Sequence, residues 1–265
     1  VCVSSGNDAA VALAEHVAGV TELFVEQMNN RARELGMKDT HFANCTGLTA
    51  ENHVTSAYDI ALMSRELLLH HPQIRSYTTI WMDTLRDGTF GLSNTNKLIR
   101  FYDGATGLKT GSTNEAKYCV SATAQRSGMR LIAIVLGAPA SQTRFNEARA
   151  MMDYGFATYR RTQVIAAGEL TGYAIPVRRG AQDTAPIAVG KGLSMLLRAG
   201  QADKLSVELN LPESIEAPQT AGTRVGDVRV LLDGQTVAEL PAVLAQDVRL
   251  PGFLEGLLLM LDHWR

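Results

Sequence analysis

Residues 103–113 read D-G-A-T-G-L-K-T-G-S-T, and this stretch decides how the chain is organised. The pattern predicts a loop that leads into a short strand ending in Lys109, Thr110 and Gly111. The lysine supplies a positive charge, the threonine a hydroxyl that can donate and accept, and the glycine leaves room for another backbone. We interpret this triplet as a surface that can receive a peptide, although three letters also fit an ordinary strand end.

The residues after the triplet predict an antiparallel sheet covered by a helix. Residues 118–124 and 130–137 are rich in β-branched and apolar side chains, and Ser127-Gly128 between them favours a hairpin turn. An amphipathic pattern follows at about residues 143–159. A strand, a hairpin and a helix in this order predict an α+β domain. We expect this domain to span residues 1–160.

Three helices are expected before the triplet. Apolar residues recur at helical spacing from about residue 8 onward, from about 20 to 35 and from about 55 to 70. The first helix should be capped by Asn7 or Asp8. The second should bury a stripe made of Leu23, Phe24, Met28 and Leu35. Residues 76–102 predict short strands around Arg86-Asp87-Gly88, followed by a polar run at residues 93–97.

The second half of the chain has a different pattern. Helical periodicity fades after residue 160, and short apolar alternations separated by Gly, Pro and Asp-Gly turns take its place. They predict a small all-β domain, a β-sandwich, at residues 161–249. The expected strands include residues 173–177, 205–209, 225–232 and 236–240, with Asp233-Gly234 as a hairpin turn. No cluster of titratable residues marks this domain, so we assign it no chemistry.

Residues 250–265 form a third kind of segment. Their apolar residues fall on one face of a predicted amphipathic helix, with Trp264 near its end. One interpretation is a terminal helix that docks on its own β-domain. The other, which we favour, is an interfacial anchor that lies in one leaflet of a membrane.

Composition excludes several classes of function. The 265 residues carry 25 basic and 27 acidic side chains, a net charge of −2, and no basic run, so nucleic acid is not an expected partner. The histidines show no metal-binding spacing, and neither a metal nor a cofactor is expected. The cysteines, Cys2, Cys45 and Cys119, lack C-x-x-C spacing, and we expect small buried side chains.

Ser5-Gly6-Asn7 at a helix start, the Lys109-Thr110-Gly111 triplet before a hairpin, and the helix after that hairpin resemble the penicillin-recognising acyl-serine enzymes. Within them, the resemblance is to the D-alanyl-D-alanine carboxypeptidases, the low-molecular-mass penicillin-binding proteins. It implies a β-lactamase/DD-peptidase-like domain followed by the small β-domain and the tail. Further matching stretches are residues 35–42, 47–48, 56–59, 103–113, 129–132 and 263–264.

The resemblance implies catalytic roles for three residues. Ser5 would relay a proton between the lysine beside the nucleophile and the leaving amine. Asn7 would hydrogen-bond the amide side of the substrate and orient that lysine. Lys109 would keep the pocket electropositive and lower the pKa of the neighbouring lysine, so that it can act as the base. Ser5 and Asn7 also fit a simple helix cap, and Lys109 also fits a solvated strand end.

It also implies substrate contacts. Thr110 would bind the terminal carboxylate of the substrate with help from Arg144, whose fork matches a carboxylate with two bonds. Gly111 would let the substrate lie close, and the backbone N–H of Ser112 would be one of two oxyanion donors. Arg144 also fits a surface charge. His41 and Asp59 lie in matching stretches, but we expect them to organise structure.

One motif of the family is missing. None of the six lysines has a serine three residues before it, so the S-x-x-K motif that carries the nucleophile and the base is absent. The chain begins V-C-V-S-S-G-N-D, without methionine or a leader, and we interpret it as truncated at its N-terminus. We therefore expect residues 1–265 alone to be inactive.

The function implied is a periplasmic carboxypeptidase, attached peripherally to the outer face of the inner membrane. It would remove the terminal D-alanine from peptidoglycan stem peptides ending in D-Ala-D-Ala and be inhibited by β-lactams. Two alternatives stay open. One is a β-lactamase, which the β-domain and the tail disfavour; the other is a peptidoglycan- or penicillin-binding module without a nucleophile.

Overall fold

The computed structural model describes residues 1–255 and divides the chain into two compact units, Val1–Ala157 and Thr158–Arg265. This boundary lies three residues before the predicted one at residue 160. The predicted amphipathic helix at residues 250–265 lies mostly outside the described residues. In the described part, no helix is long and apolar enough to cross a membrane.

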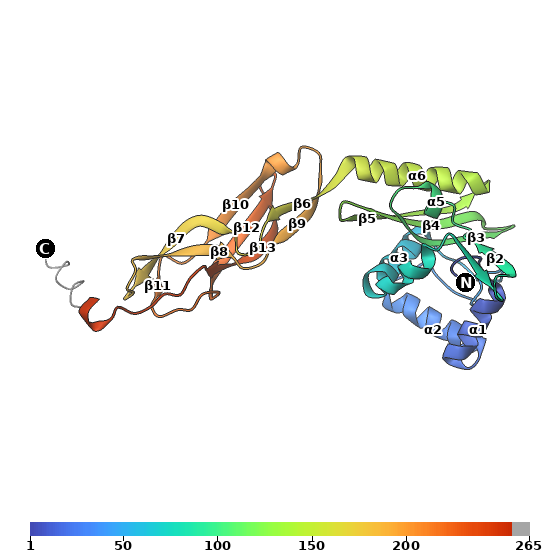
Figure 1. Ribbon diagram of the computed structural model, residues 1–265, viewed down its shortest axis with the longest axis horizontal. Helices are drawn as coiled ribbons and strands as arrows, with labels where there is room; N and C mark the ends of the chain where they lie inside the picture. The colour runs from blue at the N-terminus through green and yellow to red at the C-terminus, as the bar shows by residue number, and fades with distance from the viewer. Residues whose placement is uncertain (256–265) are drawn as a thin grey trace. The chain divides into compact units, whose positions relative to one another are not determined.

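The first unit contains the predicted antiparallel sheet. Its strands, β3 (Ala105–Thr113), β4 (Lys117–Arg126) and β5 (Met129–Ala138), are paired in the order β3-β4-β5. Ser127 and Gly128 both have positive φ, as a two-residue hairpin turn between right-twisted strands requires. Helix α6 (Ser141–Thr158) lies along one face of the sheet and α3 (Ala57–His70) lies on the other (Figure 1).

Apolar burial holds α6 on the sheet. The shared core is made of small and medium side chains from β4, β5 and α6, among them Val120, Ala122, Ala133, Phe145, Ala148 and Met152. On the opposite face, the Ser64 hydroxyl of α3 and the Ser121 hydroxyl of β4 form a buried hydrogen bond of 2.8 Å. Because both faces of β4 are covered, this strand fixes the position of its neighbour β3.

The helices before the sheet follow the prediction closely in their bounds. They are α1 (Asn7–Ala18), α2 (Thr21–Glu34) and α3, whose cap Ser56 accepts a hydrogen bond from the backbone N–H of Asp59. The predicted cap of α1 is wrong. Gly6 occupies the cap position and no side chain caps the helix, because Asn7 is already its first helical residue.

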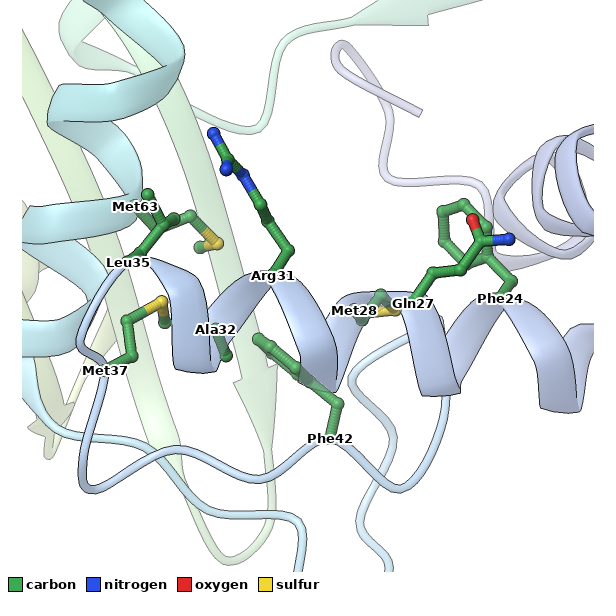
Figure 2. Close-up of a pocket in the computed structure, with 9 residues that line it drawn as sticks. All are labelled: Phe24, Gln27, Met28, Arg31, Ala32, Leu35, Met37, Phe42 and Met63. Atoms are coloured by element: carbon green, nitrogen blue, oxygen red, sulfur yellow. The ribbon is translucent and has the colours of Figure 1, made fainter.

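The predicted buried stripe of α2 is also wrong. Leu23 is 50% exposed, Phe24, Met28 and Leu35 are only half-buried, and Ala32 is the buried residue of this helix. The apolar face of α2 instead lines an open hollow of about 280 Å³ that Met37, Phe42 and Met63 border (Figure 2). Figure 2 also shows Arg31 at its edge. The described elements cover this face only in part.

The polar run before the sheet has a structural role. It follows the helical turns η1 (Pro72–Ile74) and α4 (Arg75–Thr78) and the hairpin of β1 (Met82–Leu85) and β2 (Phe90–Ser93), and it precedes α5 (Leu98–Phe101). The buried Asn94 amide donates to the carbonyls of Thr78 and Ile80, and the buried Asn96 amide donates to the carbonyl of Gly107. Asn94 thus ties this run to the segment at Thr78 and Ile80, and Asn96 ties it to β3.

The second unit is all β, as predicted. A six-stranded sheet has the order β10-β12-β13-β8-β7-β11, and a two-stranded sheet pairs β6 with β9. Asp233 and Gly234 have positive φ and form the predicted hairpin turn. The strands are β6 (Tyr159–Ile165), β7 (Leu170–Arg178), β8 (Thr184–Val189), β9 (Leu193–Arg198), β10 (Leu205–Asn210), β11 (Ile215–Glu216), β12 (Arg224–Leu232) and β13 (Gln235–Leu244), with a helical turn η2 (Ala202–Lys204).

Asp59 and His53 are two of the side chains that hold the loop between α2 and α3. The Asp59 carboxylate is 1% exposed and accepts hydrogen bonds from the backbone N–H of Asp39 and the hydroxyl of Thr40, which is the structural role expected for it. The Nδ1 of His53 accepts a hydrogen bond of 3.0 Å from the backbone N–H of Ala43. Since a backbone N–H can only donate, this nitrogen must be unprotonated.

The loop should therefore weaken in acid. Burial, and secondarily the charge of His41, lowers the pKa of His53 below its ordinary value of 6.5. The folded state then binds fewer protons than the unfolded state, so the free energy of unfolding should fall as the pH drops from 6.5 through the lowered pKa. In His53→Asn, whose side-chain oxygen can accept the same bond without titrating, this fall should be smaller. Urea unfolding at a series of pH values measures it, and equal pH dependence in the two proteins would contradict the role of His53.

Candidate active site

The turn before α1 meets strand β3 at one pair of side chains. The Lys109 ammonium donates a hydrogen bond to the Ser5 hydroxyl, 104 residues away in the sequence, and a second of 2.6 Å to the backbone carbonyl of Thr110. Ser5 has a φ of 58°, the left-handed region that non-glycine residues seldom occupy. The approach of Ser5 to Lys109, expected from the sequence, is therefore present, while their catalytic roles stay predictions.

Thr95 joins the same network and was not predicted. The Thr110 hydroxyl donates to the Thr95 hydroxyl over 2.7 Å, and the Thr95 and Ser5 hydroxyl oxygens lie 3.5 Å apart. The backbone N–H of Thr95 also donates to the carbonyl of Val3. The polar run at residues 93–97 was the only sequence signal for this residue, and it gave no indication of which side chain would face the triplet.

The electrostatics of Lys109 follow from its surroundings. Burial of the half-buried side chain lowers the pKa of Lys109, a nearby cysteine, Cys2, raises it by a smaller amount, and the positive charge of Arg144 lowers it further. The direction of the shift means that the folded chain stabilises the charged ammonium less than water does. The charge of Lys109 would therefore stabilise a neighbouring anion more strongly than the charge of an exposed lysine would.

Strand β3 offers open space beside the network. Among the described strands it pairs only with β4 and so forms the edge of its sheet, although the carbonyls of Thr106 and Gly107 at its start accept hydrogen bonds from Thr78 and Asn96. Gly111 and Ser112 are exposed, and a Cβ atom added at Gly111 would meet no other residue within 4 Å. The absence of a side chain at Gly111 is thus not required by packing within the described residues. It leaves the edge accessible to an extended peptide.

Arg144 is buried and not a surface charge. It is 7% exposed, and its Nη1 donates to the carbonyls of Gly111 and Cys119 at 3.0 and 3.2 Å. Its Nη2 donates to the Ser141 hydroxyl at 3.2 Å, while its Nε is buried without a partner among the described residues. Arg144 thus ties the start of α6 to β3 and β4. Its contact with a substrate carboxylate stays a prediction.

The structure places the other predicted residues as follows. Thr110 is 7% exposed and faces Thr95, and Asn7 is exposed at the first position of α1, where no hydrogen bond of its side chain to a described residue is formed. The expectation for the cysteines is wrong, because Cys2, Cys45 and Cys119 are free and each is partly exposed. Among residues 1–255, no group of three or more acidic, histidine or cysteine side chains is arranged to hold a metal ion.

Comparisons with known proteins identify the family. A family profile described as D-alanyl-D-alanine carboxypeptidase matches residues 1–140, and one described as penicillin-binding protein 5, C-terminal domain, matches residues 159–249. All of this chain aligns with 68% of the D-alanyl-D-alanine carboxypeptidase DacF of Bacillus subtilis at 38% identity. Some 96% of it aligns with 63% of DacC of Escherichia coli at 31% identity.

Comparison with solved structures gives the same family. Penicillin-binding protein 5 of Haemophilus influenzae matches 94% of this chain with 72% of its own, at a TM-score of 0.68 and 29% identity. A Streptococcus pneumoniae protein, PBP3, matches 94% of this chain with 75% of its own, at a TM-score of 0.70 and 28% identity. The fold is that of the low-molecular-mass penicillin-binding proteins. The chain belongs to the D-alanyl-D-alanine carboxypeptidase family and spans about two thirds of the length of the relatives named here.

Proposed function

We propose that residues 1–265 supply one wall of the active site of a serine-type D-alanyl-D-alanine carboxypeptidase. The protein would remove the terminal D-alanine from peptidoglycan stem peptides and be inhibited by β-lactams. The observation that carries the proposal is the meeting of Ser5, Lys109 and Thr110 beside the open edge of β3. The nucleophile would come from an S-x-x-K motif, which these 265 residues do not contain.

Substrate binding would use the edge of β3. An extended peptide that ends in D-Ala-D-Ala would lie along the exposed part of this strand at Gly111 and Ser112, and the empty space at Gly111 supports a close approach. The Thr110 hydroxyl would bind the terminal carboxylate. Arg144, 3.0 Å from the carbonyl of Gly111, would support this site by charge and by fixing the strand. Its buried Nε has no hydrogen-bond partner among the described residues.

The chemistry would be acyl transfer in two steps. The nucleophilic serine would lose its proton to the lysine of the S-x-x-K motif and attack the carbonyl carbon of the penultimate residue, and the C–N bond to the terminal D-alanine would break as its nitrogen takes up that proton. Ser5 would relay this proton, Asn7 would hold the amide side of the substrate, and the backbone N–H of Ser112 would bind the developing oxyanion. Water would then release the acyl group. Lys109 would favour the anionic substrate and keep a neighbouring lysine unprotonated.

The competing function is a peptidoglycan- or penicillin-binding module without a nucleophile. One observation distinguishes the two proposals. If the gene encodes S-x-x-K upstream of Val1, the enzyme is favoured; a start codon near Val1 would favour the binder. A β-lactamase is the weaker alternative, because one profile match covers a β-domain named after penicillin-binding protein 5.

The test of the enzyme is covalent labelling. The protein that joins residues 1–265 to its upstream segment should be acylated by fluorescent penicillin, and Lys109→Ala should reduce the rate of acylation by about a hundredfold or more, as expected for loss of a fixed charge that stabilises the transition state. The rate of acylation is measured by stopping the reaction at a series of times and quantifying the fluorescence of the labelled protein on a gel.

Lys38→Ala is the matched control, because Lys38 is exposed in the loop after α2 and its loss changes the net charge equally. This variant should be labelled at the wild-type rate. Normal labelling of Lys109→Ala would refute the role of Lys109, and no labelling of the wild-type protein would refute the proposed enzyme.

We further propose that the protein is periplasmic and attached to the outer face of the inner membrane through residues 251–265. The support is the apolar face of this segment in the sequence, which includes Phe253, Leu254, Leu257, Leu258, Leu261 and Trp264. Phe253 and Leu254, the described members of this face, are 87% and 74% exposed.

Deleting residues 251–265 should release the protein from membranes. Sedimentation with vesicles of zwitterionic lipid measures the bound fraction, which should fall to the level of a non-binding protein, because buried apolar area would supply the affinity. Replacing Phe253 and Leu254 by serine is a milder variant and should weaken binding in the same direction. Unchanged binding after the deletion would identify the segment as a docking helix.

A further inference from the structure

A chain of three hydroxyls connects the two ends of the proposed site. It runs from Thr110 on β3 through Thr95 in the polar run to Ser5 before α1, with oxygen distances of 2.7 and 3.5 Å. Each terminal hydroxyl has a proposed role, since Thr110 would bind the substrate carboxylate and Ser5 would relay the proton. Thr95 has no role of its own in that proposal, yet it is the only described side chain that bonds to both.

The direction of the hydrogen bonds is defined at one end. Thr110 donates its proton to Thr95, so the hydroxyl of Thr95 can pass its own proton to Ser5. Ser5 also accepts from Lys109, whose ammonium can only donate. In this arrangement, the protons of the chain point away from Thr110 and toward Ser5.

A bound carboxylate would reverse this direction. A carboxylate only accepts, so Thr110 must turn its proton toward it and can then no longer donate to Thr95. Thr95 keeps its bond to Thr110 by donating instead, and the bond between Thr95 and Ser5 then needs Ser5 as the donor. A hydroxyl chain of this kind has two complete orientations, and binding at one end selects between them.

Thr95 is held firmly enough to make this link. Its backbone N–H donates to the carbonyl of Val3, which lies two residues before Ser5. The flanking residues Asn94 and Asn96 are buried and bonded to the carbonyls of Thr78, Ile80 and Gly107. The hydroxyl of Thr95 can thus reorient, while its backbone cannot easily move.

We infer that Thr95 is a positioning residue that couples the carboxylate subsite at Thr110 to the orientation of the Ser5 hydroxyl. This inference rests on the proposed carboxypeptidase site and adds to it a dependence of the chemical step on the carboxylate of the ligand. Occupancy of the subsite would then affect both how tightly the ligand binds and how fast it reacts.

The test compares variants of residue 95 with two ligands, one that carries the carboxylate and one that lacks it, in the manner of a double-mutant cycle. The full protein with its S-x-x-K segment is acylated by benzylpenicillin and by its methyl ester, which lacks the charge, and the binding constant and the acylation rate constant are separated by stopped flow. Thr95→Val keeps the shape of the side chain without the hydroxyl. Thr95→Ser keeps the hydroxyl and serves as the matched control.

In the wild-type protein and in Thr95→Ser, the ratio of the acylation rate constants of the free acid and the ester at saturation should be the same. In Thr95→Val, this ratio should shift by about tenfold in favour of the free acid, the effect of one hydrogen bond, because the Ser5 proton can then no longer be turned to Thr95 and away from the leaving nitrogen. The advantage of the free acid in binding should remain. If Thr95→Val does not fold, Thr95→Ala is used, since it leaves the backbone bond to Val3 intact.

The outcomes separate the inference from the function on which it rests. An equal advantage of the free acid in Thr95→Val and the wild-type protein overturns the coupling, while the carboxypeptidase proposal stands. An equal shift of this ratio in Thr95→Ser and Thr95→Val also overturns it, because packing and not the hydroxyl would then be responsible. A wild-type protein that neither ligand acylates overturns both.

Discussion

The hydrogen bond from the Lys109 ammonium to the Ser5 hydroxyl is the constraint on which the candidate site depends. It joins the turn before the first helix to the edge of a sheet whose strands come a hundred residues later. A half-buried ammonium needs partners, and the carbonyl of Thr110 supplies the second one. The backbone of Ser5, held in the left-handed region, directs its hydroxyl to that position.

The surrounding fold keeps β3 in place for this contact. Strand β4 is covered by α6 on one face and by α3 on the other, so the strand that pairs with it has a fixed register. The buried Arg144 binds carbonyls of both strands, and Asn96 binds the carbonyl of Gly107 at the start of β3. Pairing with β4 uses one side of the strand, and the exposed residues Gly111 and Ser112 are its accessible part.

Much of this could be predicted from the sequence, because the relevant patterns are local. The Ser127-Gly128 turn and the Asp233-Gly234 turn both follow from backbone preferences of the residues themselves. The family motifs then predicted that Ser5 and Lys109 would meet. The burial of the α2 stripe was predicted wrongly, because periodicity identifies an apolar face but not the element that covers it. Thr95 was missed for a related reason: its importance arises only from the long-range contact of its hydroxyl with two other residues.

The central claim is that Ser5 and Lys109 act as one unit, and a double-mutant cycle on the unfolding of residues 1–265 tests it most directly. Ser5→Ala, Lys109→Ala and the double variant are compared by urea denaturation. The account predicts a coupling free energy of about 0.5–1.5 kcal/mol between the two positions, the usual contribution of such a hydrogen bond. Effects that add to within about 0.3 kcal/mol would show that the two side chains do not interact, and would contradict the account.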